Sequence, residues 1–275
     1  MLIYQLTNCT AYQMMGYVIK TDGGKVIVID GGGFNQSSEL YRVLEMVGKN
    51  VDMWILTHIH NDHYGAIAEL FRNYDDVKVA GLWRNTATSE EVINSLSEGE
   101  ARQHYEWNEI EKEFDFPLHR FSLNEEFDID NVHIEVLEIE KPEILVNNHN
   151  NQSVVLKFTE GDFTMLFLGD LGVEGGEKLL KTAGDRVKCT AVQMAHHGQG
   201  GVDIAVYKKI GATYAFWPTP KWLWDNTPYL GGEPGIGPFV TPVTIKWMEE
   251  LDTINVTSFE STIVFDTRTR TWKNI

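Results

Sequence analysis

One order of elements occurs twice along the chain, and this repetition strongly limits the folds that the chain can adopt. Residues 15–33 are typical of a β-hairpin, because two apolar runs flank an Asp-Gly-Gly turn. Residues 152–170 show the same pattern around a Glu-Gly-Asp turn. Helices and further strands are predicted after each hairpin. Since the strands are too many for one doubly wound sheet, we expect an α/β protein in which two sheets pack face to face with helices outside.

The spacing of apolar residues predicts the remaining elements. Helices are expected over residues 37–47, 65–74, 177–183, 202–210 and 244–251. Further strands are expected over residues 51–57, 77–83, 131–139, 189–195, 212–219 and 254–267. An acidic stretch over about residues 86–116 has a helical pattern and predicts one or two inserted surface helices. We expect a single domain over residues 1–275, with this insertion and with a Trp-, Pro- and Gly-rich loop over about residues 217–242.

Charge and composition narrow the class of partner. The chain has 275 residues and a formal net charge of −17. Because nucleic-acid affinity comes largely from Lys and Arg that neutralise phosphates, this charge argues against a nucleic-acid partner. The sequence shows neither a signal-peptide pattern nor an apolar run that could cross a membrane, so we expect a cytoplasmic protein with no membrane partner. The two distant cysteines, Cys9 and Cys189, are expected to be free core residues.

Four side chains that can bind metal lie within six residues, in the stretch Thr57-His58-Ile59-His60-Asn61-Asp62-His63-Tyr64-Gly65. This stretch follows a predicted buried strand. Alternate residues of a turn can point to one centre, so His58 and His60 can chelate one ion while Asp62 and His63 face a second position. Imidazole nitrogens and a carboxylate suit zinc. The alternative, a polar surface loop, accounts poorly for three histidines and one aspartate in this register.

The pattern His-x-His-x-Asp-His after a buried strand resembles the signature of the metallo-β-lactamase superfamily. Three further motifs occur in the order of that family: Asp30 in IDGGG, Asp170 in MLFLGD, and residues 195–201, AHHGQGG. The resemblance extends over about residues 14–265. It implies a four-layer αββα sandwich and two zinc ions per chain, with Mn²⁺ or Fe as alternatives. It also implies that Asp170 bridges the two ions and that Asp30 supports the site without binding metal.

Two further ligand positions are less clearly defined by the resemblance. His149 in NHNNQS lies four residues before Ser153, as in the family pattern, and is expected to complete the first site with His58 and His60. The alternative is an ordinary loop histidine, because a subgroup with asparagines here lacks that ligand. That subgroup includes competence DNA-uptake proteins and a phosphorylcholine esterase. Of the adjacent pair, we expect His197 to bind metal and His196 to face the substrate, but the sequence leaves this choice open.

The resemblance implies a dinuclear, zinc-dependent hydrolase in which hydroxide between the two ions attacks a phosphoester or phosphodiester. Asp62 is expected to hold the proton of the attacking group, and His196 is expected to act as a proton donor or to stabilise negative charge. Alternatives are hydrolysis of a carboxylic ester, thioester or lactone on the same fold. A nuclease and a non-catalytic binding protein are further alternatives, which the acidic charge and the full ligand set respectively disfavour.

Substrate specificity is expected to come from the loop over about residues 217–242. We expect its side chains to contact a small-molecule substrate, and the candidates are Trp217, Lys221, Trp222, Trp224 and Tyr229, with Asp225 as a further polar contact. Long loops without regular structure are often functional, and aromatic rings can bind a sugar face or a quaternary ammonium group. The alternative is that the tryptophans form a small core beneath the loop. The natural substrate and the oligomeric state do not follow from the sequence.

Overall fold

The computed structural model describes residues 1–86, 89–229 and 231–275. Within these residues, an eight-stranded sheet has the order β17-β16-β1-β2-β3-β5-β7-β8. Its strands are β1 (Leu2–Gln5), β2 (Gly16–Lys20), β3 (Val26–Asp30), β5 (Met53–Leu56), β7 (Leu82–Arg84), β8 (Leu118–His119), β16 (Ile263–Asp266) and β17 (Thr271–Asn274). A two-stranded sheet pairs β4 (Asn50–Val51) with β6 (Lys78–Val79).

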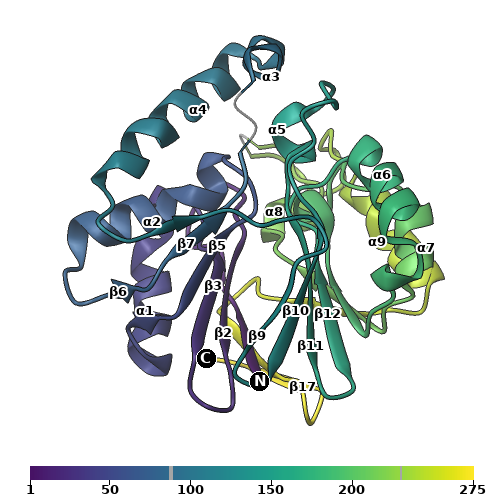
Figure 1. Cartoon of the computed structure of the whole chain (residues 1–275). Helices are drawn as coiled ribbons and strands as arrows, with labels where there is room; N and C mark the ends of the chain where they lie inside the picture. Colours follow the sequence, from purple (N-terminus) through teal and green to yellow (C-terminus); the bar gives the residue numbers. More distant parts are fainter. Residues whose placement is uncertain (87–88, 230) are drawn as a thin grey trace.

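A second large sheet of seven strands faces the first and has the order β15-β14-β13-β12-β11-β10-β9 (Figure 1). Its strands are β9 (Glu126–Ile129), β10 (Val132–Glu138), β11 (Val155–Glu160), β12 (Phe163–Phe167), β13 (Ala191–Gln193), β14 (Tyr214–Trp217) and β15 (Ile254–Thr257). Each large sheet has antiparallel pairs on one side and parallel pairs on the other. The parallel strands include β3-β5-β7 in the first sheet and β12-β13-β14 in the second. Because parallel strands end at the same edge of a sheet, the segments after β5, β12 and β13 can converge.

The space between the large sheets is filled by apolar side chains from both of them. Ile27 and Ile55 of the first sheet belong to the same buried cluster as Leu156 and Phe167 of the second. Every second residue of a strand points to the same face of its sheet, so each of these strands sends alternate side chains into the space between the sheets. Since this cluster draws on both halves of the chain, we propose that residues 1–275 form one domain.

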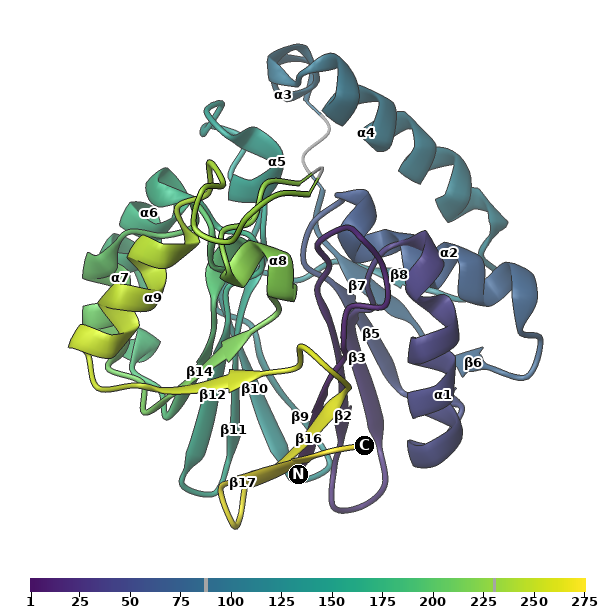
Figure 2. The same ribbon diagram turned by 180° about the vertical axis from the view of Figure 1, so that it is seen from behind.

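Helices cover the outer faces of the sheets, as Figures 1 and 2 show from opposite sides. The first sheet is covered by α1 (Ser37–Val47) and α2 (Asn61–Asn73), whose apolar faces join a second buried cluster. The other sheet is covered by α6 (Val173–Ala183), α7 (Ile204–Ile210) and α9 (Thr241–Glu250). The layers are therefore helix, sheet, sheet and helix, and the predicted αββα sandwich is confirmed.

The acidic insertion contains two helices, α3 (Glu90–Ser95) and α4 (Glu98–Ile110), while residues 87–88 of the predicted segment lie outside the described residues. Figure 1 shows α4 on the same side of the molecule as α2, above it in this view. Trp107 is fully buried in the cluster outside the first sheet, so one face of α4 packs on the body of the protein. Among the described residues, no helix has the length and apolar character needed to cross a membrane.

Three expectations from the sequence need correction. Helix α2 begins at Asn61 rather than at residue 65, so Asp62 and His63 lie in its first turn. A negative Asp62 there is favourable, because the N-terminus of a helix carries partial positive charge. The stretch 77–83 divides into β6 and β7, which belong to different sheets. Cys189 is buried as predicted, but Cys9 is exposed because it follows β1 in a surface loop.

Candidate metal centre

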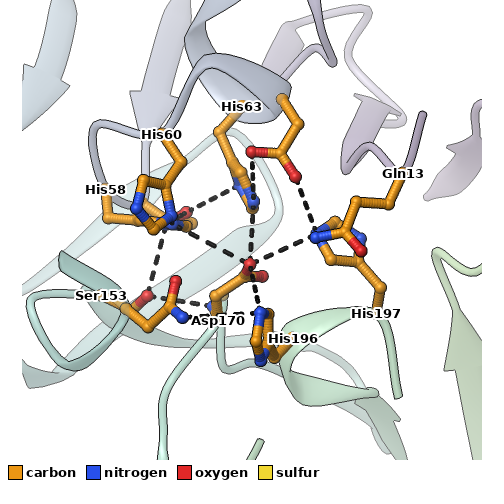
Figure 3. Close-up of polar contacts among 12 residues, drawn as sticks. Gln13, His58, His60, His63, Ser153, Asp170, His196 and His197 are labelled. Carbon is orange, nitrogen blue, oxygen red and sulfur yellow. Dashed lines mark hydrogen bonds and ion pairs between the residues drawn. The ribbon is translucent and has the colours of Figure 1, made fainter. Parts of the chain in front are cut away.

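Side chains from four separate segments meet at one edge of the two sheets (Figure 3). The loop after β5 and the first turn of α2 supply His58, His60, Asp62 and His63. Asp170 follows β12. The 3₁₀ helix η4 (Ala195–Gly198), directly after β13, supplies the two adjacent histidines, and α5 (Asn148–Asn151) lies beside them. The parallel arrangement of the strands therefore brings together residues that are more than 100 positions apart in sequence.

The most buried part of the cluster contains Asp62, His63, Asp170 and His197, whose ligand atoms all lie within 4.8 Å of one another. Oδ2 of Asp170 lies 3.2 Å from Nε2 of His63 and 3.2 Å from Nε2 of His197. Nε2 of His197 also lies 3.2 Å from Oδ2 of Asp62. Two imidazoles and two carboxylates around one point are a ligand set that zinc accepts.

A second group shares Asp170 and adds His58 and His60. Nε2 of His58 lies 3.0 Å from Nδ1 of His60 and 3.9 Å from Oδ2 of Asp170. Because Asp170 belongs to both groups, its carboxylate stands between two candidate ion positions. This is the placement that a bridging ligand needs.

The buried polar atoms of the cluster test whether metal ions fit it. Among the described residues, Nε2 of His63, Nε2 of His197 and Oδ1 of Asp170 are buried and have no hydrogen-bond partner. Buried polar atoms without partners cost free energy, so native proteins rarely leave several together. Divalent cations bound between these atoms would satisfy them all. The residues present therefore fit a pair of divalent metal ions.

In His63 and His197, a hydrogen bond to the nitrogen that faces away from the cluster determines which ring nitrogen can bind metal. Nδ1 of His63 lies 2.7 Å from Oδ2 of Asp30, and Nδ1 of His197 lies 2.9 Å from the carbonyl oxygen of Pro218. Both partners are acceptors, so we assign the ring proton to Nδ1 in each histidine and leave Nε2 free to bind metal. The predicted supporting role of Asp30 agrees with this contact, although the role itself stays a prediction.

The carboxylates and imidazoles of the cluster shift one another's pKa. Burial would lower the pKa of His197, but Asp170 and Asp62 outweigh this effect and raise it to about 10. Burial would raise the pKa of Asp170, but His197 and His63 outweigh it and hold the pKa well below its usual range. Without cations the cluster therefore holds protons beside its carboxylates. Metal ions would displace these protons, so their binding should strengthen as pH rises.

His196 and His197 differ in exposure and in direction. His197 is fully buried, whereas the side chain of His196 is 22% exposed and its Nε2 lies 4.0 Å from Oδ2 of Asp170. Both residues have left-handed backbone conformations, with φ of 51° and 54°, which point the two rings in different directions. The structure thus places His197 among the candidate ligands and His196 at the edge of the cluster.

His149 is buried in α5 and lies beside His60, one of its two expected partners, with ring centroids 5.0 Å apart. His149, His60 and Glu100 form a third group of possible ligands, which shares His60 with the group of His58 and Asp170. The prediction that His149 completes the first site therefore stays a prediction. Asn150 lies beside the cluster as well, with Nδ2 3.4 Å from Nε2 of His196.

A cavity of about 510 Å³ opens directly onto the metal centre. Three residues of the cluster, His60, Asp62 and His196, form part of its lining. Aromatic side chains form much of the rest, and they are Tyr12, Phe34, Trp222, Tyr229 and Phe239. Thr10 and four neutral amides form the other polar part of the lining, and the amides are Gln13, Asn35, Asn61 and Gln103. Substrate bound in this cavity would contact the centre from one side.

The predicted substrate loop contributes to the cavity only in part. Trp222 and Tyr229 line it and pack edge to face, with ring centroids 5.4 Å apart. Leu230 of this loop lies outside the described residues. Trp217 does not reach the cavity, because it is the last residue of β14 and is fully buried against the outer helices.

Three further predicted contacts in the loop are also corrected. Trp224 packs on Trp217 and Phe259, with ring centroids 5.0 and 5.2 Å apart, so it belongs to the small core beneath the loop. Lys221 and Asp225 form an ion pair with each other at the surface and do not line the cavity. The two predicted sequence alternatives, cavity wall and core, thus apply to different aromatic residues of one loop.

Several cavity residues were not predicted from the sequence. Helix α4 provides Gln103, whose Oε1 accepts a hydrogen bond of 2.8 Å from the backbone N–H of Asn61, and it also brings Glu100 near His60. The N-terminal loop provides Tyr12 and Gln13. The sequence held one signal for α4, since the buried Trp107 lies seven residues after Glu100 and therefore on the same helix face.

Comparisons with known proteins agree with this architecture. A family model described as the metallo-beta-lactamase superfamily matches residues 12–198. The chain is similar to the solved structure of YhfI, a metallo-beta-lactamase fold protein from Bacillus subtilis, with a TM-score of 0.58 and 13% identity over 97% of this chain and 100% of that chain. It is also similar to a variant of the CmlA beta-hydroxylase, with a TM-score of 0.56 and 9% identity over 96% of this chain. This chain spans about half of that one, since 53% of it is covered. A comparison with curated proteins gave no match.

Proposed function

The chain belongs to the metallo-beta-lactamase superfamily, most of whose members are metal-dependent hydrolases, and from this premise we propose that it hydrolyses a phosphodiester at a pair of zinc ions. The observation that carries this proposal is the placement of Asp170 between two groups of imidazoles, at the end of a cavity with room for a small molecule.

Different residues of the chain would hold the two ions, and one residue would contact both. Asp62, His63 and His197 would hold one ion, His58 and His60 would hold the other, and Asp170 would contact both. When bound, two such cations lower the pKa of water to near neutrality and stabilise negative charge on phosphate oxygens. Ser153 helps to fix the bridging residue, because its Oγ accepts a hydrogen bond of 3.0 Å from the backbone N–H of Asp170.

Two residues at the boundary of cluster and cavity can handle protons and charge. Asp62 lines the cavity, so its carboxylate can accept a hydrogen bond from the attacking group and orient it. The ring of His196 lines the cavity, and its side chain is partly exposed there. His196 can therefore donate a proton to the leaving oxygen or stabilise its charge.

The lining of the cavity favours a diester over a monoester. Among the described residues that line it, none is Lys or Arg, and the polar groups beyond the cluster are mostly neutral amides. A phosphomonoester carries close to two negative charges at neutral pH and is usually held by cationic side chains. A phosphodiester carries one negative charge, which the metal centre itself can balance. The aromatic side chains then suit a flat or apolar substituent on the second ester oxygen.

The test compares substrates on the purified full chain. Metal content is measured first, and hydrolysis of bis-p-nitrophenyl phosphate, p-nitrophenyl phosphate, p-nitrophenyl acetate and a lactone is then compared at equal enzyme concentration. We expect the diester to give the highest kcat/KM. A higher kcat/KM for the acetate or the lactone would replace this proposal with carboxylic ester or lactone hydrolysis. Redox-active iron with no hydrolysis of any substrate would indicate oxidative chemistry instead.

The Asp170→Asn variant is the control for this test. We expect it to lose turnover by orders of magnitude and to bind metal more weakly, because the amide cannot bridge two cations as a carboxylate does. Near wild-type turnover in this variant, with the fold intact by circular dichroism, would show that the hydrolysis does not depend on the cluster.

A further inference from the structure

We propose that Gln13 binds a non-bridging oxygen of the substrate phosphate and thereby selects diesters over monoesters. This inference rests on the proposed function and adds a specificity-determining residue, since Gln13 is not a member of the groups of possible metal ligands that the described residues form. Gln13 lines the cavity together with Asp62 and His196. Figure 3 shows its side chain pointing towards the cluster from the side of His197.

The first argument is that the backbone beside Gln13 is joined to the metal centre. Gln13 lies in the loop before β2, and the next two side chains, Met14 and Met15, are buried. The backbone N–H of Met15 donates a hydrogen bond of 3.2 Å to the carbonyl oxygen of Asp62, and the carbonyl oxygen of Met15 accepts one of 3.2 Å from the backbone N–H of Gly31. The loop therefore holds Gln13 beside the first turn of α2, where candidate ligands lie.

The second argument is that Gln13 has free donors. Its Oε1 accepts a hydrogen bond of 2.5 Å from Nε2 of Gln199, which lies three positions after His196 and directly follows η4. The amide nitrogen of a glutamine carries two N–H groups. Among the described residues, Nε2 of Gln13 has no acceptor within hydrogen-bond distance, whereas its oxygen is occupied. Both N–H groups are therefore available to a molecule in the cavity.

The third argument is one of charge. Gln13 is an amide joined to both α2 and η4, the two segments on either side of this end of the cavity, and the described lining has no Lys or Arg. A phosphodiester has two non-bridging oxygens that share one negative charge. With one of them facing the metal centre, the other can accept a hydrogen bond from Nε2 of Gln13. A neutral amide does not balance the second charge of a monoester, as a cationic side chain would.

Substitutions of Gln13 test this assignment on the full chain loaded with zinc. We compare kcat/KM for bis-p-nitrophenyl phosphate and p-nitrophenyl phosphate. Gln13→Leu should lower the value for the diester by about 10–100-fold, the usual effect of losing one hydrogen bond to a charged group. Gln13→Lys should raise the monoester value relative to the diester value by about 10-fold, because an ammonium group balances the second charge. An unchanged ratio in Gln13→Lys, or an unchanged diester value in Gln13→Leu, would overturn the proposal.

The Gln199→Leu variant separates a substrate contact from a purely structural one. It removes the same hydrogen bond between the two glutamines but keeps the amide of Gln13 in the cavity. We expect its diester kcat/KM to fall less than that of Gln13→Leu. Equal losses in the two variants would mean that Gln13 only joins the loop to η4. Bound zinc is measured in every variant, and loss of zinc in Gln13→Leu would also overturn the proposal, because Gln13 would then act through the metal centre.

Binding of unreactive probes separates this inference from the proposed function. Diphenylphosphinate carries one negative charge and phenylphosphonate carries two at alkaline pH, and hydrolysis does not break their P–C bonds. Calorimetry on the zinc-loaded chain should show that Gln13→Lys shifts the affinity ratio towards phenylphosphonate by about 10-fold. This shift in a chain that hydrolyses no diester would remove the proposed function and leave the contact of Gln13 standing. Diester hydrolysis by the wild type with no shift in Gln13→Lys would overturn the inference alone.

Discussion

Oδ2 of Asp30 lies 2.7 Å from Nδ1 of His63, at the centre of a small network that joins two strands to the metal centre. The same carboxylate accepts hydrogen bonds from the backbone N–H and the hydroxyl of Thr57, at 2.7 and 2.8 Å. The backbone of Asp30 is left-handed, with φ of 57°, and the carbonyl oxygen of Asp30 accepts a hydrogen bond from Nε1 of Trp54. Asp30 is therefore held from several sides and holds the His63 ring in turn.

Replacing Asp30 with Asn should weaken metal binding without removing a ligand. The amide presents N–H groups where the carboxylate accepted hydrogen bonds, so Nδ1–H of His63 loses its charged acceptor. We expect zinc affinity to fall by about 10–100-fold, the usual cost of losing such a partner. Competition with a chromophoric chelator would measure the change. Asp52→Asn is the control, because Asp52 also accepts a backbone N–H, that of Val26, but lies away from the centre. Equal affinities in both variants would contradict the role of Asp30.

The adjacent histidines should separate metal binding from catalysis. His197→Asn is expected to lose one of the two ions that Asp170 would contact, whereas His196→Asn should keep that pair of ions and lose about 10²–10⁴-fold in kcat. The loss in His196→Asn should be larger for an alkyl phosphodiester than for a p-nitrophenyl one, because the poorer leaving group needs the proton more. Metal analysis and steady-state kinetics would show this. Loss of metal in His196→Asn would reverse the assignment of the two residues.

Lys141 should stabilise the fold beneath the centre through buried contacts. Its fully buried Nζ donates hydrogen bonds to the carbonyl oxygens of Ile139 and Ser153 and lies 3.9 Å from Oε2 of Glu138. Lys141→Met would leave the buried Glu138 without its cation, and we expect it to lower the unfolding free energy by about 3–5 kcal/mol at pH 7. Urea unfolding would measure this. Lys178→Met removes a partly exposed ion pair with Glu143 and should cost about 1 kcal/mol or less.

The same lysine predicts a dependence of stability on pH. Burial lowers the pKa of Lys141 from 10.5 to about 8 in the folded protein. Between these two values the unfolded chain binds more protons than the folded one, so the unfolding free energy should rise with pH there. Lys141→Met should lack this rise, and the gap between wild type and variant should widen from pH 8 to pH 10. A gap that is constant over this range would contradict the shifted pKa.

Two tryptophans of one loop should respond to substitution in opposite ways. Trp222 lines the cavity, so Trp222→Ala should raise KM about 3- to 10-fold with a smaller effect on kcat. Trp217 is core, and Trp217→Ala should instead lower the unfolding free energy by about 3–5 kcal/mol. Kinetics and urea unfolding on both variants would test this pair. A large loss of stability in Trp222→Ala with unchanged KM would place that residue in the core as well.

The sequence predicted the layers of the fold because they depend on local patterns. The apolar run in β3 marks a strand buried on both faces, and the helical spacing in α1 marks one buried face. The structure gives α1 the predicted bounds of residues 37–47. The grouping of His58, His60, Asp62 and His63 was equally visible, since those residues are close in the chain. Asp170 and the two adjacent histidines came from the family resemblance, not from any local pattern.

Contacts between distant segments were beyond sequence reasoning. The contact between Asn61 and Gln103 joins residues that are 42 positions apart. Gln103 lies on α4, whose polar sequence predicts a solvent-exposed surface. Tyr12 meets Tyr229 at a ring distance of 5.8 Å, and neither residue's own neighbourhood indicates the other. Trp217 was mistaken for a cavity residue although the predicted strand over residues 212–219 contains it. Strands buried on both faces hide such a residue from a simple alternation of apolar and polar types.

The backbone of His196 and His197 has a consequence for engineering. Two successive non-glycine residues with φ near 50° each carry a steric cost of about 1–2 kcal/mol, which glycine would not carry. A directed-evolution experiment that rewards heat resistance alone should therefore drift towards glycine at these two positions, at the expense of the imidazoles. One that also rewards phosphodiester hydrolysis should keep both histidines and gain its heat resistance elsewhere in the chain.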